Sequence, residues 1–459
     1  MTKKINVKQL AFIIVPIFLE LLLQILAGNV DKIMVSNDNL ANSINQANSI
    51  LDLLVVSMSV LASASLILIN QYKGAGDTEK ENKIYNLAFY FNLFIGIILS
   101  IILLTCAKPF LTLMQTKGEV LDNATLYLMI NGGAIFLQAM MLSLQCFLRS
   151  NEYMKTSLSV SITFNLINIG LNALFLFAIK LNPILAVALG SVISRTIGVI
   201  LLLIFFKIRL HKSLSLKLLF PINFKELKKI ISIGLPSAGE SISYSLSQIV
   251  ILAFINIIGS KFESVAPAAK TYSSMIANVT YLFVNAASQG MQILLGRYLG
   301  ENDKELANKL VWKTTLISII VSEVFALIIM LSSNLIFGLL TSDSEVIKLC
   351  SKIMKIEIAL ELGRAVNMVM VRGLQTSGDV MFPTLLAIIC CWTIATLGSY
   401  LLGISLKWGL VGVWVSMSLD ELTRAVIFIF RWKSGKWKRK DLVHENTSIN
   451  WWWNEWKKF

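Results

Sequence analysis

Two 16-residue stretches of the chain, LINQYKGAGDTEKENK at 68–83 and LLGRYLGENDKELANK at 294–309, repeat one another. Most of the letters that they share are polar, so a general bias toward apolar residues does not explain the match. The spacing of about 220–228 residues is far longer than the repeat of a solenoid. We therefore expect the chain to contain two copies of one large unit. The matching pairs include Tyr72 and Tyr298, Gly74 and Gly300, Asp77 and Asp303, Glu79 and Glu305, Pro16 and Pro236, and Glu20 and Glu240.

The composition decides where such a chain resides. Of its 459 residues 56% are hydrophobic and 15% charged, with a mean hydropathy of +0.71. Soluble domains are about 45–50% apolar and about 25% charged, so the sequence predicts an integral membrane protein. Lys and Arg outnumber Asp and Glu by 41 to 27, and we expect this surplus at lipid headgroups rather than on nucleic acid.

Apolar segments long enough to cross about 30 Å of hydrocarbon recur along the whole chain. The links with most of the Lys and Arg alternate with links that have few, and the positive-inside rule then places both termini in the cytoplasm. The predicted fold is an all-α membrane protein with twelve transmembrane helices in two parallel six-helix lobes. The predicted spans are 11–35, 49–72, 84–106, 122–148, 156–180, 184–208, 231–258, 271–298, 310–340, 346–375, 382–405 and 408–431.

The predicted domain boundaries follow from these spans. An amino-terminal lobe covers 1–208 and a carboxy-terminal lobe covers 230–432, related by an axis along the membrane normal because each copy has an even number of spans. The linker at 209–229 is Leu- and Lys-rich and is expected to lie on the cytoplasmic membrane surface. A basic, Trp-rich cytoplasmic tail at 433–459 is expected to anchor on anionic lipid. This plan predicts a cleft between the lobes that opens alternately to either side.

Ionisable residues inside the spans are the functional candidates, because insertion of such a residue costs roughly 2.5–3.5 kcal/mol. In the first span Glu20, Gln24 and Asp31 lie on one helical stripe. The fifth span has a second stripe of polar residues, which could either bind a cation or form hydrogen bonds between helices. Carboxylate and amide oxygens suit Na⁺, and a carboxylate alone suits a proton. The second stripe consists of Asn165, Asn168 and Asn172.

The second half has more acids, namely Glu240, Glu357, Glu361 and Asp420, together with Glu323 and Glu421. Arg364 and Arg424 follow Glu361 and Asp420 at helical ion-pair spacing, so a structural role is at least as plausible for these acids as a coupling role. Arg195 has no in-helix partner, and we expect it to extend toward the membrane surface.

These residues stand in motifs that resemble those of the multidrug and toxic compound extrusion (MATE) family, in the branch common in Gram-positive bacteria. The resemblance covers essentially the whole chain. It rests on GNVDKIMVS (28–36), INIGLN (167–172) and GSVISR (190–195) in the first half. In the second half it rests on GLPSAGE (234–240), QILLGRYLG (292–300), ELGRAVN (361–367), SGDVMFP (377–383) and DELTRAVIFIFRWKSGKW (420–437).

The resemblance implies a twelve-helix antiporter that exports organic, often cationic, compounds against an inward flow of Na⁺ or H⁺. It also implies a cation site made by Asp31, Asn168, Asn172 and Ser191, with Na⁺ bound to the first three where Na⁺ is the coupling ion. Asn172 stands where some members have a second acid. Tyr244 stands where one branch has an acid in the seventh helix, so the roles of Glu240 and the other acids of that lobe are not transferred.

We expect a monomer in the cell membrane with a small organic substrate and no cofactor besides the coupling ion. Three alternatives remain open. A flippase for lipid-linked precursors would need more cations for phosphate than Arg195 and Arg364 supply. A passive channel would conduct without a counter-ion. A membrane-embedded enzyme would need a nucleophile with a base, or a metal cluster, and the sequence has no such motif.

Overall fold

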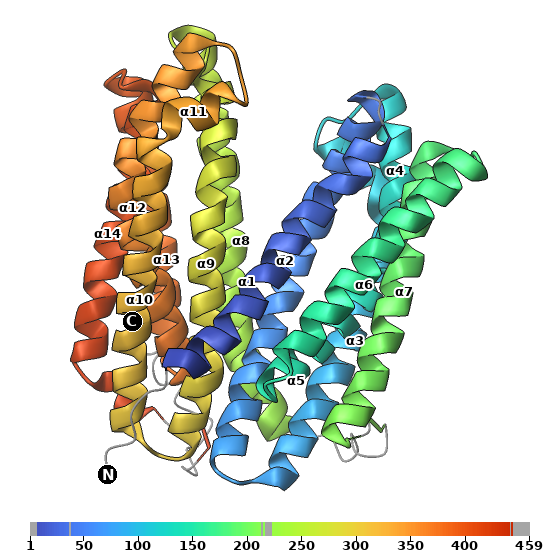
Figure 1. The fold of residues 1–459 in the computed structure, drawn as a ribbon, viewed down its shortest axis with the longest axis vertical. Coiled ribbons are helices and arrows are strands. Elements are labelled where there is room, and N and C mark those ends of the chain that lie inside the picture. The colour runs from blue at the N-terminus through green and yellow to red at the C-terminus, as the bar shows by residue number, and fades with distance from the viewer. Residues whose placement is uncertain (1–6, 36–37, 213, 216–222, 441, 444–459) are drawn as a thin grey trace. The chain divides into compact units, whose positions relative to one another are not determined.

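The computed structural model describes residues 7–35, 38–212, 214–215, 223–440 and 442–443. Within these ranges the chain is helical and forms no strand (Figure 1), which confirms the predicted all-α class. The first half has α1 (Val7–Met34), α2 (Asp38–Gly74), α3 (Thr78–Leu113), α4 (Gly118–Gly133), α5 (Ile135–Ser150), α6 (Met154–Ala173) with the π-helical η1 (Leu174–Ala178), and α7 (Pro183–Leu210).

The second half repeats this order of long helices. It has α8 (Phe224–Lys261), α9 (Ala266–Gly300), α10 (Lys304–Leu331), α11 (Ser333–Gly338), α12 (Ser344–Thr376), α13 (Met381–Cys390) with the π-helical η3 (Cys391–Thr396) and η4 (Ser399–Ser405), α14 (Gly409–Lys433) and the 3₁₀ turn η5 (Lys436–Arg439). Each predicted span coincides with one long helix or with one broken helix among these elements.

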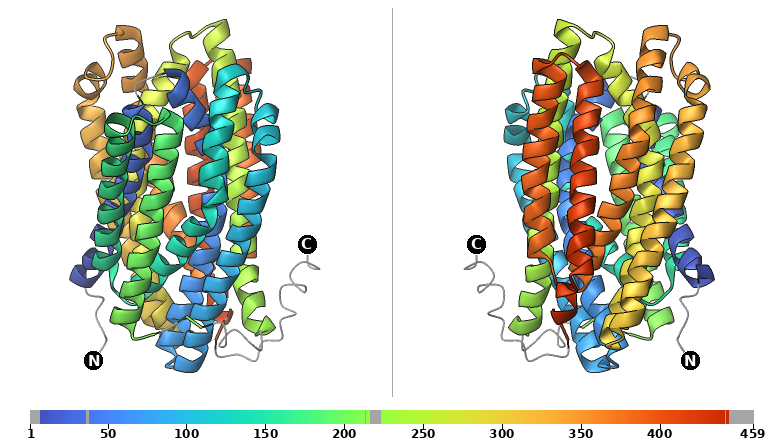
Figure 2. Two further views of the ribbon diagram at one scale, coloured as in Figure 1. Left: turned by 90° about the vertical axis from the view of Figure 1, so that its right-hand side faces the viewer. Right: turned by 90° about the vertical axis from the view of Figure 1, so that its left-hand side faces the viewer.

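The helices pack into two compact units. Over their described residues, one unit is Val15–Ala238 and the other is Gly239–Ser448 together with Met1–Ile14. The border therefore passes through α1 and α8, each close to its proline, Pro16 or Pro236. In the second unit α9, α10 and α12 run side by side (Figures 1 and 2). The lobe boundaries drawn from the sequence stay a prediction, and most of the predicted tail (441 and 444–459) lies outside the described residues.

The repeated sequence stretches adopt the same local structure. Asp77 begins α3 and accepts a hydrogen bond from the Lys80 backbone N–H at 3.0 Å, and Asp303 begins α10 in the same way with Leu306 at 2.9 Å. The residues just before these caps, Gly76 and Asn302, have φ of 72° and 57°. An aspartate side chain satisfies an otherwise unpaired N–H of the first helical turn, so the same turn chemistry starts the third helix of each copy.

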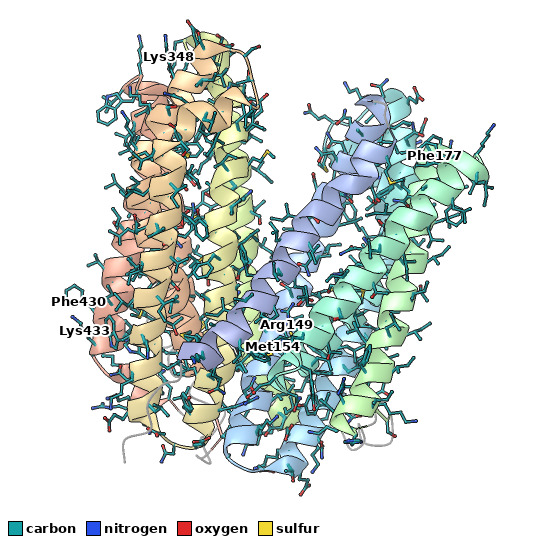
Figure 3. All side chains as sticks on the ribbon, viewed as in Figure 1. Arg149, Met154, Phe177, Lys348, Phe430 and Lys433 are labelled. Atoms are coloured by element: carbon teal, nitrogen blue, oxygen red, sulfur yellow. The ribbon has the colours of Figure 1, made fainter. Side chains whose placement is uncertain are left out.

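Eight of the described helices are long and apolar enough to cross a membrane, and α4 with α5 makes a ninth, bent by 46° at a short break. Of the other long helices, α12 and α14 contain charged residues that pair inside their unit, and α9 contains many Ser, Thr, Asn and Gln residues. Hydropathy alone therefore undercounts the spans that contain polar or charged side chains. Large apolar side chains such as Phe177 and Phe430, 67% and 66% exposed, project outward from the helices (Figure 3).

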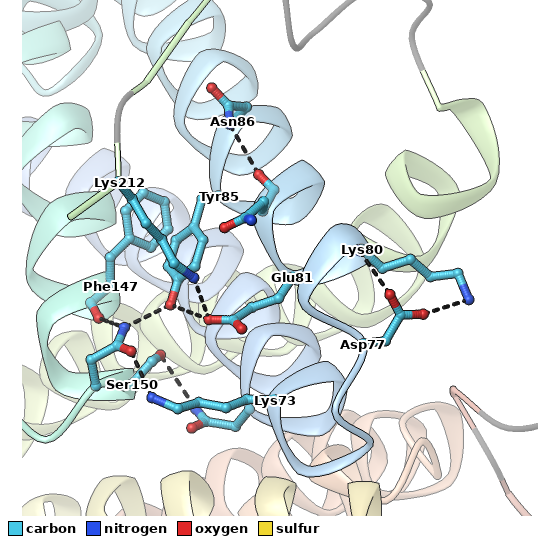
Figure 4. Close-up of polar contacts among 12 residues, drawn as sticks. Lys73, Asp77, Lys80, Glu81, Tyr85, Asn86, Phe147, Ser150 and Lys212 are labelled. Atoms are coloured by element: carbon cyan, nitrogen blue, oxygen red, sulfur yellow. Dashed lines mark hydrogen bonds and ion pairs between the residues drawn. The ribbon is translucent and has the colours of Figure 1, made fainter. Parts of the chain in front are cut away.

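Polar contacts attach the chain after α7 to the ends of α2 and α3. Lys212 pairs with Glu81 at 2.6 Å (Figure 4), and the Ser215 backbone N–H donates to the Asn86 side chain at 2.8 Å. Tyr72, at the end of α2, donates to Glu226 of α8 at 2.6 Å. The link between the two halves is thus held against the Val15–Ala238 unit on both sides of residues 216–222, which lie outside the described residues together with 213.

A buried ion pair holds α1 in place just after Pro16. The fully buried Glu20 carboxylate lies 2.8 Å from the Arg149 guanidinium of α5. Ser157 and Ser161 of α6 also donate to Glu20, at 3.0 and 2.9 Å. Gln24, which the sequence placed on the same stripe, is exposed. Glu20 therefore joins three helices through a charge that is already neutralised.

Gly96 on α3 provides a first test of this packing. A Cβ atom there would lie 2.8 Å from the Phe136 Cα and 2.9 Å from the Ala139 Cβ of α5. We expect Gly96→Ala to destabilise the protein by about 1–3 kcal/mol through overpacking, measured as a lower melting temperature in detergent. Gly170→Ala is the control because nothing lies within 4 Å of its added methyl group. Equal melting temperatures for the two variants would contradict this packing.

The Glu20 ion pair gives a second test. Arg149→Met leaves a buried carboxylate without its cation, and we expect a loss of about 3–5 kcal/mol, seen as a lower melting temperature. The double variant Glu20→Gln/Arg149→Met removes both charges and recovers most of that loss. Lys83→Met is the surface control, since Lys83 pairs with Glu79 while 46% and 78% of their side chains are exposed. A double variant as unstable as Arg149→Met would argue against the pairing.

Candidate cation site in the first unit

Asp31 lies near the end of α1, and its carboxylate is buried, with 8% of the residue exposed. Three other helices supply hydrogen-bond donors to it. Asn172 of α6 donates through Nδ2 to Oδ1 at 2.7 Å. Ser191 of α7 and Tyr127 of α4 donate through their hydroxyl groups to Oδ2, at 3.0 and 3.2 Å. A single carboxylate therefore connects α1 to α4, α6 and α7.

A second layer of polar residues surrounds these donors. Asn168, one turn before Asn172 on α6, donates to the Ser191 hydroxyl at 3.2 Å. Arg195, one turn after Ser191 on α7, donates to the Asn131 side chain of α4 at 3.2 Å. Arg195 thus bonds to a residue of a neighbouring helix inside the unit rather than only extending to the membrane surface. The structure brings together all four residues that the family resemblance assigned to a cation site.

The two buried acids of α1 differ in the kind of partner they have. Glu20 contacts the permanent cation of Arg149, whereas Asp31 receives hydrogen bonds from an amide and two hydroxyl groups, all neutral. An acid with an arginine partner has its charge balanced already. The hydrogen bonds of Asp31 all come from neutral groups, and the guanidinium of Arg195 acts on its carboxylate only electrostatically from the second layer.

The atoms around Asp31 are those of a hard-cation or proton site. Within the described residues no group of three or more His, Cys, Asp or Glu side chains lies close enough to hold a metal ion, so a transition-metal centre is absent from that part of the chain. Carboxylate, hydroxyl and amide oxygens are ligands for hard cations. The Asn172 Oδ1 is buried and has no hydrogen-bond partner among the described residues, which leaves one such oxygen unused.

Four of the predicted acids of the second half, Glu357, Glu361, Asp420 and Glu421, form ion pairs inside the other unit, whereas no ion pair is found for Glu240 or Glu323 among the described residues. Arg364 of α12 pairs with Glu361, three residues before it, and with Glu357 at 3.5 Å. The other Glu357 oxygen accepts the indole N–H of Trp414 at 2.6 Å. The Lys270 ammonium lies 4.6 Å from the centre of the Trp414 ring. Glu361 keeps one buried oxygen, Oε2, without a hydrogen-bond partner among the described residues.

Arg424 forms the centre of a second ionic group on α14. It pairs with Asp420 at 2.6 Å and with Glu421 at 3.0 Å. Asn367 of α12 donates to the other Glu421 oxygen at 2.6 Å. Glu240 on α8 has a weaker contact, a 3.5 Å hydrogen bond from Thr384. The two pairs expected from helical spacing, Glu361 with Arg364 and Asp420 with Arg424, are thus both present.

Sequence reasoning missed two residues that matter at the buried acids. Tyr127 contacts Asp31, and Arg149 neutralises Glu20. Tyr127 is an isolated tyrosine in an apolar span and has no pattern that distinguishes it from a core residue. Arg149 stands near the end of a predicted span, where arginines commonly reach the membrane surface. The roles of both residues depend on how neighbouring helices are aligned along one another, and a single sequence does not show that alignment.

Comparisons with known proteins agree with this architecture. The family model described as MatE matches residues 16–174 and 236–401, one copy in each half. The "Uncharacterized transporter YisQ" of Bacillus subtilis is 32% identical over 433 residues, which cover 93% of this chain and 94% of the relative. A "Probable multidrug resistance protein NorM" of Thermotoga maritima is 22% identical over 95% of this chain and 94% of its own length.

The fold also matches a solved structure. A crystal structure described as MATE in the bent conformation superposes with a TM-score of 0.85 at 16% identity, covering 94% of this chain and 96% of that one. At this identity the likeness concerns the fold alone. The family model covers both halves of the chain and the relative covers nearly all of it, so the protein is a multi-pass membrane protein and belongs to the MATE family of transporters.

Proposed function

We propose that the protein is a secondary active antiporter that exports organic, lipophilic or cationic compounds by alternating access, driven by inward flow of Na⁺ or H⁺ through the Asp31 site. The observation that carries this proposal is the buried Asp31 carboxylate, which three other helices hold by neutral donors only. Relatives described as multidrug resistance or export proteins support the class of substrate.

Binding of a cation at Asp31 must change the contacts of α1. With the carboxylate ionised, Asn172, Ser191 and Tyr127 all point a hydrogen at it. A bound Na⁺ needs oxygens in those places, and a proton turns one carboxylate oxygen into a donor. Either change requires the hydroxyl groups or the amide to turn. The packing of α1 against α4, α6 and α7 is thereby coupled to the occupancy of the site.

Coupling to export then needs the substrate and the cation to favour different conformations. A ligand that binds both conformations equally shifts nothing, however tightly it binds. In the proposed cycle the cation favours the conformation that releases the substrate outside, and substrate binding from inside favours loss of the cation. Both termini are cytoplasmic in this scheme, the chain works as a monomer, and the coupling ion is the only inorganic partner. No catalytic step and no nucleic acid enter it.

The charge of the second unit favours cationic compounds. Glu357, Glu361, Asp420 and Glu421 face two arginines, Arg364 and Arg424, within the ionic groups of α12 and α14. With Lys270, which lies near Glu357, the group has four acids and three basic side chains, and the one surplus negative charge attracts cations. Tyr244, one turn after Glu240 on α8, is 43% exposed, and an aromatic ring binds organic cations through its face.

The flippase alternative receives less support. A site for lipid-linked phosphate needs cations that are not already neutralised. Arg364 and Arg424 are paired with acids. Arg195 keeps its charge, because Asn131 is neutral, but that charge already acts on the Asp31 carboxylate. These arginines therefore leave little positive charge for a phosphate.

The role of Asp31 is tested by Asp31→Asn in everted membrane vesicles, with ethidium as the transported probe. We expect the variant to insert normally and to lose energy-driven ethidium transport, because its amide neither releases a proton nor balances a cation. Asp122→Asn is the matched control, since Asp122 is an exposed residue of α4 whose side chain is 75% exposed, and it should transport like the unmodified protein. Normal driven transport by Asp31→Asn would refute the proposal.

The coupling ion is tested in proteoliposomes with the same probe. An imposed pH gradient and an imposed Na⁺ gradient are applied separately, while internal pH and ²²Na⁺ flux are recorded. We expect one of the two gradients to drive ethidium against its own gradient, and we expect that cation to move in the opposite direction. Ethidium movement that ignores both gradients would favour a channel. Movement of a fluorescent lipid phosphate without ethidium transport would favour the flippase.

A further inference from the structure

The Asn172 side chain has unequal contacts at its two ends. Its Nδ2 donates to Asp31 at 2.7 Å. Its Oδ1 has no hydrogen-bond partner among the described residues, although the side chain is fully buried. That oxygen instead lies beside Gly190 of α7, where a Cβ atom would come within 2.1 Å of it. The amide therefore occupies space that exists only because residue 190 has no side chain.

We propose that Gly190 is a positioning residue of the Asp31 site, whose missing side chain lets the Asn172 amide stand where it donates to Asp31. This inference rests on the proposed function, because it assigns Gly190 to the same cation site. Gly190 touches neither the carboxylate nor the cation and acts only through Asn172.

The distances separate an effect on the amide from an effect on helix packing. A Cβ at residue 190 would lie 3.2 Å from the Asn172 Cγ and 3.4 Å from its backbone nitrogen. The backbone distance is an ordinary van der Waals contact, so α6 and α7 need not separate. The 2.1 Å approach to Oδ1 is impossible, so the amide has to move. Because Oδ1 and Nδ2 belong to one planar group, displacing the oxygen also removes Nδ2 from Asp31.

Because the Asn172 Oδ1 has no hydrogen-bond partner among the described residues, the position of this amide depends on the room beside Gly190. A buried amide usually has hydrogen bonds at both ends, and these bonds fix its orientation. Here the bond to Asp31 and the room beside Gly190 hold it. An alanine at 190 therefore meets no opposing hydrogen bond at Oδ1. We expect the added methyl group to change the stability of the fold little and to remove the Asn172 amide donor from the cation site.

The test is a double-mutant cycle with Gly190→Ala, Asn172→Ala and the variant that carries both changes. The readout is the half-saturating concentration of the driving cation for ethidium transport in proteoliposomes. A hydrogen bond to a charged group is worth enough to change this concentration by about tenfold or more. We expect Gly190→Ala to shift it in the same direction as Asn172→Ala. The double variant should behave like Asn172→Ala alone, because the alanine at 190 has no amide left to displace.

Gly198→Ala is the matched control on the same helix, two turns along. Its added Cβ would lie 3.4 Å from both Met141 and Phe164, and we expect its half-saturating concentration to stay within about twofold of the unmodified value. Melting temperatures in detergent show whether each variant is folded. If Gly190→Ala fails to fold, the double variant should fold again, since the obstructing amide is gone; failure of both variants to fold would overturn the inference.

The remaining outcomes separate this inference from the function on which it rests. Normal cation dependence of Gly190→Ala, with Asp31→Asn inactive, overturns the positioning role and leaves the proposed function intact. Effects of Gly190→Ala and Asn172→Ala that add in the double variant show a packing role and also overturn it. Active Asp31→Asn overturns the proposed function itself.

Discussion

The high cost of charge inside an apolar bundle governs the interior of this protein. A buried carboxylate needs a partner, and the chain meets that need in two ways. Glu20, Glu361 and Asp420 have arginine partners, whereas Asp31 has neutral donors. In the first arrangement the charge is already balanced by a fixed cation, on another helix for Glu20 and on the same helix for Glu361 and Asp420. In the cycle that we propose, a small mobile cation balances the second kind of charge and leaves again.

The two copies of the internal repeat keep the same helix-capping turns but differ in the partners of their buried acids. Asp77 and Asp303 begin corresponding helices with the same capping bond, because any copy of the turn must satisfy the same backbone N–H groups. Glu20 and Glu240 also occupy matching positions after Pro16 and Pro236. Glu20 has the Arg149 guanidinium in direct contact, while Glu240 accepts a 3.5 Å hydrogen bond from Thr384, with Arg424 and Arg372 acting on it from further away. Backbone requirements are local and survive duplication, but the partner of a buried acid lies on another helix and can change separately in each copy.

The same distinction explains how far the sequence predicts the structure. The repeat, the all-α class and the long helices follow from local patterns, and intrahelical pairs such as Asp420 with Arg424 follow from spacing. Grouping Asp31 with Asn172 and Ser191 required the family resemblance, because these residues come from three helices. The roles of Tyr127 and Arg149 lay beyond both, since each depends on the register between helices. Gln24 shows the limit of a helical stripe: it lies one turn from Glu20 and is nevertheless exposed.

A cation site of the proposed kind also limits which other hydrogen bonds the donors around Asp31 can make. A donor that has to turn away from Asp31 when a cation arrives must not be held by strong bonds elsewhere. Asn172 meets this condition because its oxygen has no hydrogen-bond partner among the described residues. Ser191 meets it less fully, since Asn168 also donates to its hydroxyl group at 3.2 Å. In the proposed cycle, loose attachment at Asn172 and firm attachment at Glu20 let the Asp31 end of α1 respond to a cation while the end near Pro16 stays bound to α5 and α6.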